Sequence, residues 1–167
     1  MQKFLPCFFL FFSLHLTAQD MTVKELGRIL KKETRITEDG DGMWTVDYLE
    51  HPVMIVTDER ADRMRIFTPI VAREEINERA LERMLEANFH TALDAKYSIW
   101  EGVVISVYTH PLQQLSAEQF KDALRQVVRL SETFGTTFSG TDYIFGNEEE
   151  QEKERRLNVK PGGDKRS

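Results

Sequence analysis

The chain has 167 residues, with 22 Lys and Arg against 28 Asp and Glu, and a formal net charge of -6 at pH 7. This acidic balance disfavours nucleic acid or an anionic membrane surface as the main partner, because both are negatively charged. The length fits about one domain, and a single cysteine, Cys7, excludes a disulfide within one chain.

Residues 1–18 have the layout of a secretory signal peptide. Lys3 supplies one positive charge, and an apolar run over residues 4–16 leads to Thr and Ala. A spanning helix would need roughly 20 apolar residues, and Pro6 and His15 interrupt this shorter run. We therefore expect a protein exported to the periplasm or secreted, without stable membrane insertion after cleavage. An uncleaved anchor is the alternative.

Removal of this segment would change the chemistry that remains possible. It takes away Cys7, so the mature chain would have no thiolate nucleophile and no cysteine metal ligand. It also removes Lys3 and no acidic residue, which makes the net charge -7. We expect residues 19–140 to form the folded domain and residues 141–167 to form a charged, flexible tail.

The first half of the domain predicts a helix and three strands. Thr22 and Glu25 form a capping box, followed by an apolar stripe that ends near Glu33. The stripe consists of Val23, Leu26, Ile29 and Leu30. Residues 38–42 then turn the chain, and strands are expected over Met43–Leu49, Pro52–Thr57 and Arg63–Ile70. Short connections favour antiparallel pairing.

A second helix is expected over Glu75–Phe89, before two further strands. Its predicted buried stripe is Ile76, Ala80, Leu81, Met84, Leu85 and Phe89. The strands His90–Ile99 and Val103–Thr109 form a hairpin, with Gly102 available for positive φ at the turn.

The last helix carries the clearest local signals. Ser116 and Gln119 form a capping box, and Leu115 with Phe120 has the spacing of a hydrophobic staple. Gly135 can take the left-handed conformation that ends many helices. The predicted buried stripe is Phe120, Ala123, Leu124, Val127, Val128 and Ser131. The pattern as a whole predicts an α+β fold in which three helices pack with a five-stranded antiparallel sheet, in the order α-β-β-β-α-β-β-α.

This order resembles the YbjN family and the type III secretion chaperone fold. The resemblance rests on Leu85–Phe89, the hairpin around Gly102, and Pro111-Leu112 leading into Leu115–Gln119, and it covers residues 21–135. It implies a homodimer with an apolar surface that holds extended segments of a protein client, and it implies no catalytic residues. Such chaperones act in the cytosol, whereas the signal peptide here favours an exported binding protein.

Two strands are apolar on both faces, over Val53–Val56 and Val103–Tyr108. Such a strand is usually covered on both faces. If the three helices share one side, the second face would be closed by a long helix, by the segment Phe138–Phe145, or by a second copy of the protein. Dimerisation or client binding through this face and the edge strands is the preferred hypothesis.

We find no constellation of residues that predicts catalysis, a metal or a cofactor. Asp39–Gly42 resembles the start of a calcium loop but lacks the distal Glu, so a plain turn is expected. His51, His90 and His110 lack metal-pair spacing. A pocket in which His51 and His110 meet Asp47 or Asp94 would make the protein a small-molecule binder or hydrolase, which is the alternative function. Ser98, Ser106 and Ser116 have no nucleophile context.

Aromatic side chains of the strands are the candidate binding residues. Most of them should be core, but aromatics also dominate interface anchors. We predict possible protein-binding roles for Trp44, Tyr48, Trp100 and Tyr108. Trp100 is the strongest of these, because a tryptophan at a hairpin turn is difficult to bury within one domain. A structural envelope component that makes its contacts through the charged tail is a third possibility.

Overall fold

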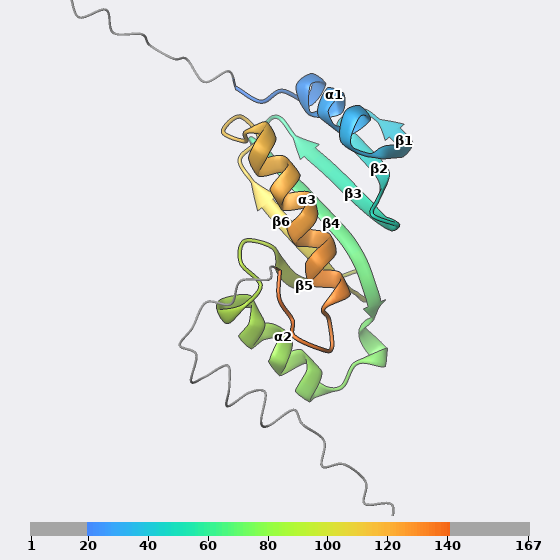
Figure 1. Cartoon of the computed structure of the whole chain (residues 1–167), viewed down its shortest axis with the longest axis vertical. Coiled ribbons are helices and arrows are strands. Elements are labelled where there is room, and N and C mark those ends of the chain that lie inside the picture. The colour runs from blue at the N-terminus through green and yellow to red at the C-terminus, as the bar shows by residue number, and fades with distance from the viewer. Residues whose placement is uncertain (1–19, 141–167) are drawn as a thin grey trace, which may run out of the picture.

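A computed structural model describes residues 20–140 of the chain (Figure 1). The expected signal peptide at residues 1–18 and the expected charged tail at residues 141–167 lie outside the described residues. The elements, in chain order, are α1 (Val23–Glu33), β1 (Arg35–Gly40), β2 (Met43–Tyr48), β3 (His51–Asp58), β4 (Arg63–Ala72), η1 (Arg73–Glu75), α2 (Glu78–His90), β5 (Lys96–Trp100), β6 (Val103–His110) and α3 (Ala117–Glu132).

The strands form one antiparallel sheet in the order β1-β2-β3-β4-β6-β5. The α+β class, the three helices and the antiparallel pairing are confirmed. The prediction of five strands is wrong, because the sheet has six strands.

The strand that sequence reasoning missed is β1. Residues 35–40 contain one apolar side chain, Ile36, and almost all of the strand is exposed, so no apolar alternation marks it. It forms because the chain reverses after Gly40, and Gly40 pairs with Met43. Gly42 lies in this turn with φ 74, and a Cβ there would lie 2.5 Å from Thr57 Oγ1, so only glycine fits.

The boundary between α2 and β5 also differs from expectation. The helix begins after Asn77, whose side chain accepts a hydrogen bond from Ala80 N at 2.9 Å, and it continues to His90. Residues 91–95 are a turn in which Leu93 has φ 56. The predicted strand His90–Ile99 is therefore wrong in its first half, and β5 starts at Lys96.

Helices α1 and α3 cover one face of the sheet (Figure 1). The capping boxes predicted the starts of both helices well, since the Thr22 and Ser116 side chains accept hydrogen bonds from Glu25 N and Gln119 N. The centre of the face of the sheet that meets these helices is buried. Its core side chains are Trp44 and Val46 of β2, Val53 and Ile55 of β3, Met64 and Ile66 of β4, and Val104 and Tyr108 of β6.

Helix α2 lies at the β5 edge of the sheet. The Asn88 side chain accepts a hydrogen bond from Tyr97 N at 2.7 Å and donates one to Tyr97 O at 3.1 Å, so the amide occupies the place of a neighbouring strand. The predicted buried stripe is only partly correct. Met84 is buried, but Leu85 and Phe89 are 59% and 87% exposed.

The chain after α3 folds back on the helix side of the sheet. Phe138 is buried, and its ring centroid lies 5.8 Å from that of Tyr97, a residue of the buried face. Thr91 Oγ1 donates to Phe138 O at 2.6 Å, and Gly140 N donates to Thr91 O at 3.1 Å. The described part of the segment Phe138–Phe145 therefore does not close the second face of the sheet.

Candidate protein-binding face

The sheet has a second face, which points away from α1 and α3. Side chains alternate along each strand, so the register assigns every residue to one face. One row of this second face runs across five strands: Thr45, Met54, Phe67, Val107 and Lys96 are paired in succession from β2 to β5. No helix among the described residues lies over it (Figure 1). We call it the open face.

The open face is mainly apolar at its centre. Its apolar side chains include Met43, Met54, Val56, Phe67, Pro69, Trp100, Val103, Ile105 and Val107. Trp100 is 49% exposed and Met43 is 55% exposed, while Met54, Val56 and Val107 are half-buried. These residues form a contiguous surface of the kind that marks interaction sites.

Trp100 shapes one end of the open face. Its ring meets that of Phe67 edge to face, with the centroids 5.3 Å apart. Phe67 is 9% exposed, whereas Trp100 is 49% exposed, so part of the Trp100 side chain stays in solvent. An aromatic pair of this kind contributes about 1 kcal/mol beyond the area that it buries. Trp100 is thus a fixed, half-exposed aromatic anchor.

Two cations lie on this face, and Lys96 at the β5 edge already donates hydrogen bonds to Asn88 O and Leu93 O. Arg65 is exposed in the second row of the face, between Val56 and Thr109. Among the described residues it has no ion-pair partner, whereas Arg35 in the same sheet pairs with Asp47. A ligand segment with an apolar body and a carboxylate near Arg65 would complement this arrangement.

The two edges of the sheet are poor places for an added strand. The β1 edge carries Arg35, Glu38 and Asp39 and has a register shift between Ile36 and Glu38, and charge and irregularity both protect edges. At the β5 edge the Tyr97 backbone is already bonded to Asn88. The open face therefore offers more to a partner than either edge.

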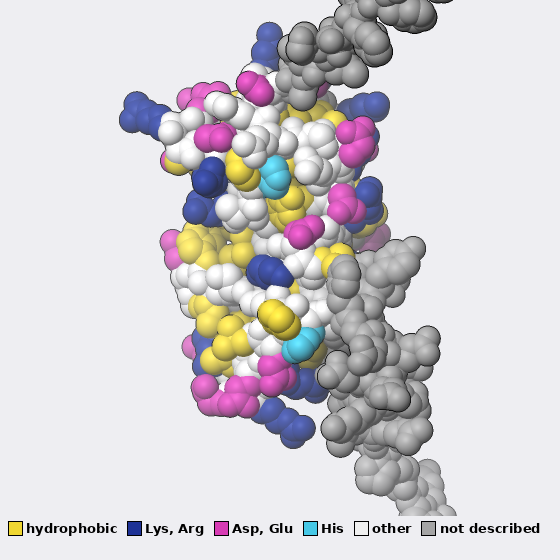
Figure 2. All heavy atoms as spheres, turned by 90° about the vertical axis from the view of Figure 1, so that its left-hand side faces the viewer, with side chains coloured by type: hydrophobic (Ala, Val, Ile, Leu, Met, Phe, Trp, Pro, Cys, Tyr) yellow, Lys and Arg dark blue, Asp and Glu magenta, His cyan; other side chains and the backbone are white. Residues whose placement is uncertain are grey.

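Figure 2 shows the molecule from the left-hand side of Figure 1. Hydrophobic side chains gather on the left and lower left of this view, between charged side chains. A second exposed apolar surface lies on α2, where Leu85 and Phe89 are one helical turn apart and both point outward. We call these two residues the α2 pair.

The structure does not bring the four predicted binding aromatics together. Trp44 and Tyr108 are 6% and 8% exposed on the buried face, and Tyr48 is half-buried on the same face. Trp44 packs under α1, close to Gly27, where an added Cβ would lie 3.3 Å from the indole. Trp100 alone lies on the open face. Its role in client contact stays a prediction, and Arg65 joins it as a residue that sequence reasoning missed.

Tyr108 occupies a partly charged part of the core. Burial raises the pKa of its hydroxyl, and the carboxylates of Asp94 and Asp122 raise that pKa further. Its ring stacks on His110 at 6.0 Å between centroids. The phenol is therefore neutral near pH 7 and packs as a core aromatic.

The histidines do not converge. His51 pairs with Tyr48 at one end of β3, whereas His110 pairs with Met64, which lies opposite Thr57 at the other end. At roughly 3.3 Å per strand residue, these ends are about 20 Å apart. His51 Nε2 instead lies 3.2 Å from a Glu132 carboxylate oxygen. The predicted pocket around His51 and His110 is not formed.

The remaining catalytic and metal candidates have structural places. Asp39–Gly42 belongs to the β1–β2 hairpin, and no group of three or more His, Cys, Asp or Glu side chains among residues 20–140 could hold a metal ion. Ser116 caps α3, and Ser106 is fully buried in the sheet. No helix in this range is both long and apolar enough to cross a membrane.

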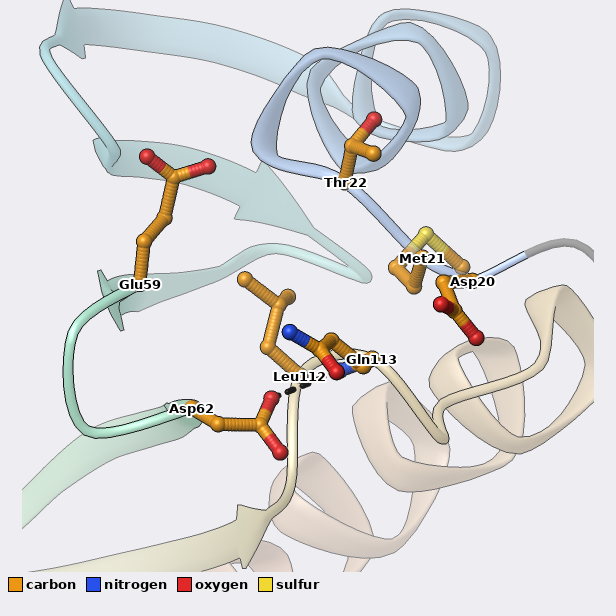
Figure 3. Close-up of a pocket in the computed structure, with 7 residues that line it drawn as sticks. All are labelled: Asp20, Met21, Thr22, Glu59, Asp62, Leu112 and Gln113. Carbon is orange, nitrogen blue, oxygen red and sulfur yellow. Dashed lines mark hydrogen bonds between the residues drawn. The ribbon is translucent and has the colours of Figure 1, made fainter.

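A small pocket opens where the chain enters the domain (Figure 3). Its lining includes three carboxylates, those of Asp20, Glu59 and Asp62. The Asp62 carboxylate accepts a hydrogen bond from Gln113 N at 2.8 Å, and Figure 3 shows the Glu59 and Asp20 side chains on opposite sides of the pocket. The Asp62 carboxylate thus ties two loops together, and the three carboxylates do not converge on a common point.

Comparison with solved structures places the fold among secretion chaperones. The HopA1-SchA chaperone-effector complex matches with 12% identity, 64% of this chain, 87% of that chain and a TM-score of 0.51. The ExsC-ExsE complex matches with 18% identity over 66% of this chain and 90% of that chain, with a TM-score of 0.52. The Yersinia pestis type III secretion chaperone SycH, in complex with a fragment of YscM2, matches with 14% identity over 68% of this chain and 100% of that chain. The TM-score is 0.51. No curated protein sequence matches the chain.

The sequence-based resemblance to the type III secretion chaperone fold is therefore confirmed, while its YbjN part stays a prediction. The model of one protein family matches residues 22–134, which span α1 to the end of α3. This chain belongs to the Tir chaperone protein (CesT) family.

Proposed function

We propose that this protein is a non-enzymatic, chaperone-like binding protein that holds an extended segment of a protein client on the open face. The observation that carries the proposal is the contiguous apolar surface around Met54, Phe67 and Trp100, which no described helix covers. Aromatic anchors of this kind dominate the energetics of protein interfaces.

Two of the structural matches support a protein client, because they are complexes of a chaperone with another protein: HopA1-SchA is a chaperone-effector complex, and SycH is in complex with a fragment of YscM2. Their sequence identity to this chain is low, so they support the fold and the kind of partner.

Export and self-association complete the proposal. The signal-peptide pattern of residues 1–18 supports a periplasmic or secreted location. The α2 pair supports a homodimer, because a two-fold axis beside α2 would bury Leu85 and Phe89 of both copies at once. This arrangement leaves the open face of each copy free for a client.

Client binding can be tested with a synthetic peptide that alternates Val and Thr and carries one central Glu. We expect Val56→Glu and Trp100→Ala to weaken binding about tenfold or more, because the first places a carboxylate beside Arg65 that repels the peptide's Glu and the second removes the anchor. Leu49→Glu, in the exposed β2–β3 turn, is the matched control and should bind like wild type. Calorimetric titration gives the affinities. Equal affinities for wild type, Val56→Glu and Trp100→Ala would reject the open face as the binding surface.

A further inference from the structure

The described chain ends on the helix side of the sheet, beside the loop that precedes the edge strand β5. Gly140 N donates to Thr91 O, and a Cβ at Gly140 would lie 2.5 Å from Ala92 O, so the backbone is pressed against the loop before β5. The strand that follows this loop starts at Lys96, which pairs with Val107 in the first row of the open face. The next residues of the chain thus start near the β5 edge, and they must pass this edge to reach the row.

The sequence after Gly140 matches the chemistry of the open face. Residues 143–145 are Tyr-Ile-Phe, and Glu148, Glu149 and Glu150 follow after a Gly-Asn pair. The open face presents apolar side chains on β6 and β4, with Arg65, which has no ion-pair partner within residues 20–140, farther across the sheet. Along the tail, the apolar triplet comes before the carboxylates. Across the open face from β5, the apolar side chains likewise come before Arg65.

The segment after Gly140 is long enough to reach the open face. Ten extended residues reach at most about 33 Å. Two strand spacings, from β5 to β4, are about 10 Å, and passing the edge of the sheet requires about 10 Å more. Residues 141–150 are therefore long enough to bring the apolar triplet over β6 and the glutamates to Arg65.

We propose that residues 141–150 dock on the open face of their own chain, with residues 143–145 on the apolar row and Glu148–Glu150 facing Arg65. The segment acts as an internal pseudo-client that a true client displaces. This inference rests on the proposed function for the identity of the competitor, while the docking itself is tested without any client.

A second copy is a less suitable occupant of the open face. A two-fold contact through this face would bring the two Arg65 side chains into the same interface, where like charges repel. A tethered segment meets no such repulsion and has an effective concentration in the millimolar range. Charge complementarity thus favours the tail.

Trp100 reports on this docking, because it is the half-exposed tryptophan of the open face, whereas Trp44 is buried under α1. Acrylamide quenching of the full-length chain, with Trp100→Phe as the reference for the Trp44 signal, measures the shielding of Trp100. A chain that stops at Gly140 should show roughly twofold stronger quenching of Trp100, because one side of the indole is then uncovered.

A charge swap keeps the tail in place and separates docking from folding. Reversing Glu148, Glu149 and Glu150 to Lys should expose Trp100, and adding Arg65→Glu to that triple variant should restore its shielding. Reversal of Glu82, Glu86 and Glu118, three exposed glutamates on helices α2 and α3, is the matched control. It should leave quenching unchanged.

Two results would overturn the inference. Quenching of Trp100 that is the same with and without residues 141–167 would show that the tail does not cover the face. Shielding that increases with protein concentration would assign the face to a second copy.

The peptide titration separates the two proposals: if Val56→Glu abolishes peptide binding while truncation leaves Trp100 unchanged, only tail docking fails. If truncation exposes Trp100 but no variant alters peptide binding, only the client surface fails.

Discussion

Tyr97 is the residue that ties the edge strand to the helix layer. Its hydroxyl donates to Leu130 O of α3 at 2.7 Å, and its ring lies edge-on to Phe134 and Phe138, with centroids 5.7 and 5.8 Å away. The side chain is 4% exposed. Burial raises the pKa of this phenol well above its ordinary value of 10.0. The neutral form is therefore part of the folded state.

The raised pKa of Tyr97 predicts loss of stability at alkaline pH. Above pH 10 the unfolded chain ionises this phenol while the folded chain keeps the proton, so the free energy of unfolding falls as pH rises through that range. Urea titrations between pH 8 and pH 11 should show a shallower decline for Tyr97→Phe, although this variant starts about 1 kcal/mol less stable because it lacks the hydrogen bond. Parallel declines for both proteins would contradict the assignment.

At the scale of elements, the end of α2 serves as a cover for the edge of the sheet. Asn88 replaces a missing strand with its side-chain amide, and the turn that follows is held by α3, since Gln126 Oε1 accepts hydrogen bonds from Asp94 N and Ala95 N at 3.1 and 3.2 Å. Two side chains from different helices therefore fix where β5 begins. The same contacts protect the edge from pairing with other chains.

Replacing Asn88 should loosen this edge. We expect Asn88→Ala to lower the free energy of unfolding by about 2 kcal/mol, because two hydrogen bonds to the Tyr97 backbone are lost. Asn88→Asp keeps the acceptor for Tyr97 N and should lose about half as much at neutral pH. Urea denaturation gives the energies, and amide hydrogen exchange at Tyr97 locates the change. An unchanged exchange rate at Tyr97 in Asn88→Ala would show that the amide does not hold the edge.

At the scale of the whole molecule, two exposed apolar surfaces lie on different sides of the fold. The open face belongs to the sheet, and the α2 pair belongs to a helix beyond its β5 edge. Each has its own proposed use, the first for a client or the tail and the second for self-association. The two uses can be separated by placing charges on one surface at a time.

Light scattering across a dilution series tests the division of these surfaces. The chain over residues 19–167 should be a dimer, and Leu85→Glu with Phe89→Glu should make it monomeric, because charges would enter the interface. Met43→Glu with Val56→Glu adds the same charge to the open face and should leave the dimer intact. The reverse pattern would move the dimer interface to the sheet and contradict the proposed client surface.

The chemistry of neighbouring residues by itself predicted much of the secondary structure. The caps at Thr22 and Ser116 and the apolar period of α3 are properties of neighbouring residues, and they gave the helix positions and the α+β class correctly. The turn at Asp41-Gly42 was equally visible. The strand before it was missed because it has almost no apolar side chains, although an Asp-Gly pair ahead of an alternating strand is itself a hairpin signal.

The sequence by itself determined the class of fold, the antiparallel pairing and the presence of two-sided apolar strands, because these follow from periodicity and turn chemistry. Only the tertiary structure decided which apolar side chains are covered. Leu85 and Trp44 are both apolar residues that belong to a periodic apolar pattern of the sequence. Leu85 is nevertheless exposed on α2, whereas Trp44 is buried under α1. Burial depends on where distant elements lie, and that placement left Trp100 and Arg65 together on the open face.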